Sequence, residues 1–106
     1  MHYTCQTEGQ RLTVTLYGEL DHHGAVSLRS ELDRLIERER PRFFALCLSE
    51  VSFCDSSGLG LVMGRLKKCA SVGASMVIRE PSVAVEKILL LAGMDKLIKI
   101  ERTERV

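Results

Sequence analysis

A short polar stretch between two apolar segments holds the side chains best suited to chemistry. It is Cys54-Asp55-Ser56-Ser57-Gly58-Leu59-Gly60, and it leads into apolar residues at helical spacing. Helix capping explains one polar side chain, because Asp55 or Ser56 can accept from the free backbone N–H groups of a helix start. Such a cap stabilises a helix by roughly 0.5–2 kcal/mol. Capping does not explain three polar residues in a row. The pattern therefore indicates a further role for one of the serines.

The same position suits a phosphate group. A helix start carries partial positive charge and unpaired donors, so a serine phosphorylated in the first turn is tolerated without unfolding the helix. Gly58 and Gly60 remove side chains beside the hydroxyl, which lets another protein's active site or a nucleotide phosphate approach the backbone. The alternative is that these glycines serve only close contact between helix and sheet.

The elements before this stretch alternate between strand and helix periods. Leu12, Val14 and Leu16 alternate with polar residues, which predicts a strand with one buried face. Residues 3–7 are its predicted hairpin partner at the sheet edge. Asp21 is a predicted N-cap of a helix that ends before Pro41. Its apolar stripe consists of Ala25, Leu28, Leu32, Leu35 and Ile36, and its charged face, predicted to be solvated, of Arg29, Glu31, Arg34, Glu37 and Arg38.

The second half of the chain predicts a strand–helix–strand unit and a closing helix and strand. The apolar run 43–48 is a predicted central strand, followed by a short loop to Phe53. The next helix ends at Gly73, and a parallel strand follows over 75–78. The predicted last elements are a helix from Ser82 to Gly93 and a strand over 97–100. The two predicted helical stripes are Leu59, Val62, Met63, Leu66, Cys69 and Ala70, and Val83, Val85, Ile88, Leu89, Leu91 and Ala92.

Composition narrows the function classes. The 106 residues predict one domain spanning 1–106. Lys and Arg number 15 against 14 Asp and Glu, and a formal charge of +1 gives no field that would hold a nucleic acid or an anionic membrane. No apolar segment approaches the roughly 20 residues of a membrane helix, and the polar N-terminus is not a signal sequence. We expect a cytoplasmic protein.

Cysteine and histidine spacing predicts neither a metal site nor a disulfide. Cys5, Cys47, Cys54 and Cys69 form no C-x-x-C pair and have no histidine at the spacing of zinc ligands. We expect them to be reduced, small apolar core residues. The adjacent residues 22 and 23, both histidines, would point about 100° apart on a helix, which favours a capping or surface role.

Two motifs in this sequence resemble the anti-anti-sigma factors of the STAS domain family. They are Gly18-Glu19-Leu20-Asp21-His22-His23 and Phe53-Cys54-Asp55-Ser56-Ser57-Gly58-Leu59-Gly60, in the order typical of that family. The resemblance extends over nearly the whole chain. It implies an α/β STAS fold, a mixed sheet of four or five strands with helices packed on one side. It also implies that Ser57 receives a phosphate and that partner binding uses Asp21, Asp55, Ser56, Ser57, Gly58, Leu59 and Gly60.

The mechanism implied by the resemblance is partner switching in the control of sporulation transcription. The unphosphorylated protein binds an anti-sigma factor that is also an ATP-dependent serine kinase, and the sigma factor is released. Phosphorylation of Ser57 ends binding, and a serine phosphatase resets the protein. The chain is then a substrate and ligand without a cofactor, and not an enzyme.

Three alternatives remain from the residues. Residues 58–64 follow a strand with three glycines, and Glu80 lies about 20 residues on, as in dinucleotide-binding oxidoreductases, but the chain is short for two mononucleotide-binding halves. A serine hydrolase is disfavoured because neither serine lies in G-x-S-x-G. The third alternative shares the fold: a STAS scaffold module of a stressosome-like or lipid-transport complex.

Overall fold

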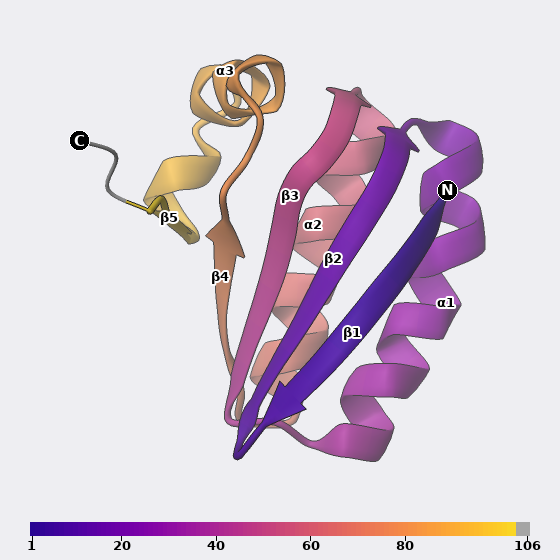
Figure 1. Ribbon diagram of the computed structural model, residues 1–106, viewed down its shortest axis with the longest axis vertical. Helices are drawn as coiled ribbons and strands as arrows, with labels where there is room; N and C mark the ends of the chain where they lie inside the picture. The colour runs from indigo at the N-terminus through magenta and orange to yellow at the C-terminus, as the bar shows by residue number, and fades with distance from the viewer. Residues whose placement is uncertain (104–106) are drawn as a thin grey trace.

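A mixed five-stranded sheet organises residues 1–103, the part of the chain that the computed structural model describes (Figure 1). The strands are β1 (His2–Glu8), β2 (Arg11–Leu20), β3 (Phe43–Cys54), β4 (Ser75–Arg79) and β5 (Lys99–Glu101), and they lie in the order β1-β2-β3-β4-β5. The strand β1 pairs antiparallel with β2, and the other three pairings are parallel. The helices are α1 (His22–Glu39), α2 (Ser56–Ser71), α3 (Val83–Leu91) and a short 3-10 turn η1 (Met94–Lys96).

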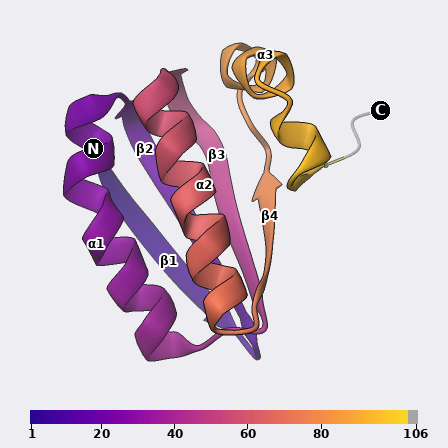
Figure 2. The ribbon, with the colours of Figure 1, turned by 180° about the vertical axis from the view of Figure 1, so that it is seen from behind.

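The helices α1 and α2 lie side by side over one face of the sheet (Figure 2). The alternating residues Leu12, Val14 and Leu16 of β2 are fully buried in the core on that side, as their period predicts. The helix α3 instead lies at the end of the sheet, next to β3. Its N-cap residue Ser82 donates a hydrogen bond of 2.8 Å from Oγ to the carbonyl oxygen of Val51. The predicted α/β sheet is confirmed, with two of its helices on one face.

The central strand β3 is longer than predicted. Residues 49–53, predicted as a loop because they include Ser49, Glu50 and Ser52, continue the strand to Cys54. They pair with the last residues of β2 through register shifts at residues 15–19, where Gly18 has a φ of +116°. Pairing with β2 satisfies backbone groups on one side of this polar segment, and bulges of this kind increase the twist of a strand.

The predicted apolar stripes hold to different degrees. All five stripe residues of α1 are buried. In α2, Val62 and Cys69 are buried and Ala70 is exposed, while Leu61 and Arg65 occupy further buried positions that the stripe did not include. In α3, Val85 and Leu89 are buried, whereas Val83 and Leu91 are exposed. The prediction for α3 was partly wrong because a helix at the end of a sheet buries only a narrow side.

Cysteines occupy two kinds of environment. Cys54 and Cys69 are buried, as expected, but Cys5 is exposed on the edge strand β1 and Cys47 is half-buried. The expectation of a core position was therefore wrong for Cys5. Among the helices of residues 1–103, none is long and apolar enough to cross a membrane.

Candidate functional site

The two sequence motifs meet at one end of the sheet. Because β2 and β3 are parallel neighbours, α1 and α2 begin at the same end (Figure 1). The backbone N–H of Asp55 donates to the carbonyl oxygen of Leu20 at 3.3 Å. This bond joins the end of β2 to the start of α2, and it brings the segments after both strands into contact.

The two acidic residues of the motifs are helix caps. Oδ1 of Asp21 accepts from the backbone N–H of Gly24 at 3.0 Å. Oδ1 of Asp55 accepts from the N–H groups of Ser57 at 2.9 Å and Gly58 at 3.1 Å. Each carboxylate thus satisfies donors that a helix start leaves free, and its negative charge is favoured there. Both side chains have a clear structural role whatever else they do.

The two serines of α2 differ in environment. Ser56 is exposed, while Ser57 is half-buried and faces a hollow of about 250 Å³ between α1 and α2. The hollow is lined by His22, Ala25, Val26 and Arg29 from α1, and by Ser57, Gly60 and Leu61 from α2. A group attached to Ser57 would therefore lie between the two helices, whereas one attached to Ser56 would point to solvent.

Sequence reasoning missed the α1 side of this hollow. His22 was expected at the surface, where it lies, and Arg29 was assigned to the solvated face. Residues 22, 25, 26 and 29 form one stripe at helical spacing directly after the Asp21 cap. That spacing was a usable signal, but the sequence does not say which stripe of α1 lies against the start of α2.

The two glycines of the second motif have different surroundings. A Cβ at Gly58 would lie 2.7 Å from Sγ of Cys54 and would collide with the backbone of Leu20, so Gly58 allows the helix to approach the sheet closely. A Cβ at Gly60 would meet nothing within 4 Å. Gly60 lines the hollow and leaves it open. The sequence left two explanations for the glycines, close packing of helix on sheet and access to the serine hydroxyl. The structure supports close packing at Gly58 and access to the hydroxyl at Gly60.

Two further residues of the second motif, Cys54 and Leu59, contribute to the core. Leu59 is half-buried and packs against the core. Burial, together with the nearby Asp55 charge, raises the pKa of the Cys54 thiol from 9.0 to about 11. The thiol is therefore protonated at neutral pH and unsuited to nucleophilic chemistry.

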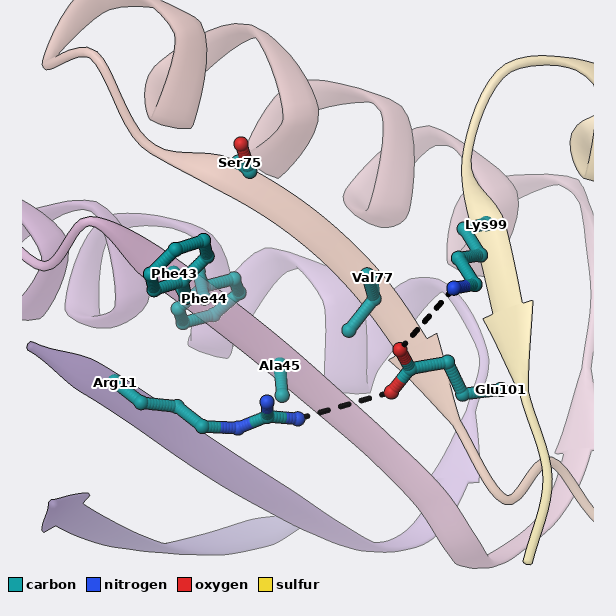
Figure 3. Close-up of a pocket in the computed structure, with 8 residues that line it drawn as sticks. All are labelled: Arg11, Phe43, Phe44, Ala45, Ser75, Val77, Lys99 and Glu101. Carbon is teal, nitrogen blue, oxygen red and sulfur yellow. Dashed lines mark ion pairs between the residues drawn. The ribbon is translucent and has the colours of Figure 1, made fainter.

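A second hollow lies away from these motifs. It measures about 310 Å³ and is lined by the first residues of several strands, including Arg11, Phe43 and Ser75 (Figure 3). Glu101 pairs there with Arg11 and Lys99, each at 3.7 Å. Because the strands β2, β3 and β4 are parallel, their first residues lie at the opposite end of the sheet from Ser57. This hollow is not part of the site at Ser57.

The geometry disfavours both enzyme alternatives. The backbone N–H groups of Ser57 and Gly58, which a dinucleotide phosphate would use, already donate to the Asp55 carboxylate and are not free to bind a pyrophosphate. His22 shares the hollow with Ser57, but within residues 1–103 no hydrogen bond joins the two side chains. The base contact that activates a serine nucleophile is therefore missing from the described part of the chain.

Comparison with known proteins links this arrangement to a family. The STAS domain model matches residues 3–106. An anti-sigma F factor antagonist of Paenibacillus polymyxa is 36% identical over 93 residues, which cover 88% of this chain and 80% of that protein. An anti-sigma-B factor antagonist of Bacillus subtilis (strain 168) is 30% identical over 89 residues, which cover 84% of this chain and 80% of that protein.

Structural similarity gives the same result. The solved structure of the anti-sigma factor antagonist SpoIIAA in its unphosphorylated form matches with a TM-score of 0.82 and 25% identity, covering 98% of this chain and 90% of that one. The STAS fold expected from the two motifs is confirmed. The chain belongs to the STAS domain family, among its anti-sigma factor antagonists.

Proposed function

We propose that this chain binds an anti-sigma factor with serine kinase activity and releases the sigma factor which that protein holds. The sequence relatives named as anti-sigma factor antagonists support the partner class. The chain acts in the cytoplasm as a single domain, and as ligand and substrate rather than as a catalyst. A sporulation sigma factor is the proposed target, on the resemblance of both motifs to that branch of the family.

One observation supports phosphorylation of Ser57 as the switch that controls partner binding. Ser57 is half-buried at the capped start of α2 and lines a hollow between α1 and α2. Val26 and Phe53, each 48% exposed, belong to the same end of the sheet and offer apolar contact area to a partner. The relative SpoIIAA was solved both in an unphosphorylated and in a phosphorylated form, which supports phosphorylation of this chain. The bare hydroxyl is the binding form.

Phosphorylation is a transfer from ATP to Ser57. The bond between the γ-phosphorus and its bridging oxygen breaks, a bond forms from Oγ to phosphorus, and ADP and the hydroxyl proton leave. The product carries about −1.5 to −2 additional charge at neutral pH, and burying that charge in an interface built around a neutral hydroxyl is costly. Partner binding is lost, and a serine phosphatase restores it by hydrolysis.

Peptide mapping after reaction with the purified kinase and ATP tests the acceptor. We expect the phosphate on Ser57, in the parent and in Ser56→Ala, and no efficient labelling of Ser57→Ala. The Ser56→Ala variant is a matched control because it removes a neighbouring hydroxyl from the same helix turn. Labelling chiefly at Ser56, or equal labelling of Ser57→Ala, contradicts the proposal. Failure of the chain to bind any anti-sigma kinase would favour the scaffold alternative.

A further inference from the structure

We propose that the hollow between α1 and α2 receives the phosphate of phosphorylated Ser57 within the same molecule, with Arg29 as the pairing cation and His22 as a second donor. This inference rests on the phosphorylation proposed above. It assigns to the α1 side of the hollow a role that the two motifs do not cover. Both α1 residues line the same hollow as the acceptor serine.

Donors at the start of α2 are already in use. The N–H groups of Ser57 and Gly58 donate to the carboxylate of Asp55. A phosphate on Ser57 therefore cannot take these two groups without displacing the cap. Its three acceptor oxygens need other donors, and an arginine is the side chain best matched to a phosphate. The hollow supplies an arginine, Arg29, from the facing helix α1.

Arg29 is free to change partners. It makes no ion pair or hydrogen bond with any residue of the described range 1–103. Two other cations of these helices are engaged: Arg65 lies 2.9 Å from Asp33, and Lys68 lies 2.8 Å from Glu37. Arg29 also stands close to a like charge, since burial lowers the pKa of Arg65 and the charge of Arg29 lowers it further. An anion at Ser57 would relieve that repulsion.

The side chains around the hollow favour an anion. Among residues 1–103, no Asp or Glu lines this hollow. The carboxylates of the two motifs, Asp21 and Asp55, accept from backbone N–H groups as helix caps. The charged or titratable lining groups are Arg29 and His22, both from α1. Phosphorylation would then change the surface in two ways. It would add negative charge at Ser57, and it would pair Arg29, which is exposed in the unphosphorylated form.

The test places phosphoserine at position 57 by genetic encoding, without any kinase, and follows the second ionisation of the phosphate by phosphorus NMR. In the parent we expect its pKa below the usual value of about 6. Arg29→Gln should raise this phosphate pKa by roughly 0.5, as for loss of an exposed cation. Arg34→Gln is the matched control, because Arg34 is an exposed arginine of the same helix that does not line this hollow. Arg29→Lys should retain part of the shift.

Equal phosphate pKa values in the Arg29→Gln and Arg34→Gln proteins would overturn the inference. The unphosphorylated Arg29→Gln protein should unfold at the same urea concentration as the parent, since Arg29 is exposed and unpaired among residues 1–103. A second variant, His22→Gln, should give a smaller rise than Arg29→Gln. Because no kinase is used, a negative result here leaves the proposed function standing, and failed labelling by a kinase leaves this measurement valid.

Discussion

Gly58 packs directly on Leu20, and a Cβ at Gly58 would stand 2.5 Å from the carbonyl oxygen of Leu20. This distance lies well inside van der Waals contact, and the obstacle is backbone rather than a movable side chain. The same carbonyl accepts the hydrogen bond from the N–H of Asp55. A side chain at position 58 would therefore disturb the junction that holds Ser57 beside α1.

Gly58→Ala should destabilise the fold by roughly 1–3 kcal/mol, as an overpacked position does. Gly60→Ala is the matched control, because a Cβ there meets nothing within 4 Å. It should gain up to about 1 kcal/mol from the higher helix propensity of alanine. Urea unfolding of the three proteins measures both changes. A Gly58→Ala protein as stable as the parent would show that the contact relaxes without cost.

The buried ion pair between α1 and α2 should be asymmetric in its effect on stability. Arg65 is 3% exposed, whereas the Asp33 side chain is 36% exposed. Asp33→Ala leaves a buried guanidinium without its counter-ion and should cost roughly 2–4 kcal/mol. Arg65→Met leaves a carboxylate that reaches water and should cost less than about 1.5 kcal/mol. Glu31→Ala, which removes an exposed charge of the same sign from α1, controls for net charge. The reverse order in chemical denaturation would contradict this account.

The periodic core of this fold was predictable from sequence. The alternation over residues 12–16 and the stripe of α1 need only the strand and helix periods, and both are buried as expected. The segment 49–53 was missed because its polar side chains are typical of a loop, while the pairing with β2 that makes it a strand is a long-range property. Arg65 was missed because its counter-ion Asp33 comes from another helix.

The site was predictable in part. Residue type and position alone predict Asp21 as a cap, and they leave Asp55 and Ser56 as candidates for the second cap. The structure shows Asp21 and Asp55 in these roles. The hollow beside Ser57 depends on how α1 lies against α2, which no local pattern specifies. The sequence therefore predicted only that Arg29 belongs to a solvated charged face, whereas in the structure it lines the hollow together with Ser57.

Stability should fall in alkali because of two buried thiols. Burial raises the pKa of Cys54 and of Cys69 from 9.0 to about 11 each. The unfolded chain therefore loses these protons first as the pH rises. Their contribution to the free energy of unfolding is full below about pH 9 and is lost as the pH approaches about 11, on the order of 2–3 kcal/mol per thiol.

Urea unfolding between pH 8 and 10.5 measures this loss. Replacing both buried cysteines by alanine should flatten the alkaline part of the curve. Cys5→Ser should leave it unchanged, because Cys5 is exposed. If the curve of the double variant falls as steeply as that of the parent, other groups cause the alkaline loss.

Charge at position 57 should decide partner binding. Ser57→Ala removes the hydroxyl without adding charge, so it should still bind the anti-sigma kinase and resist inactivation by ATP. Ser57→Asp places one negative charge at the same helix turn, with fewer acceptor oxygens than a phosphate, and should bind roughly 10-fold more weakly, which corresponds to about 1.4 kcal/mol. Ser56→Asp controls for charge at the exposed neighbour and should weaken binding less, because Ser56 is not one of the residues that line the hollow. Calorimetry with purified kinase and matched nucleotide measures all four proteins. Equal affinities of the alanine and aspartate variants at position 57 would rule out charge at Ser57 as the switch.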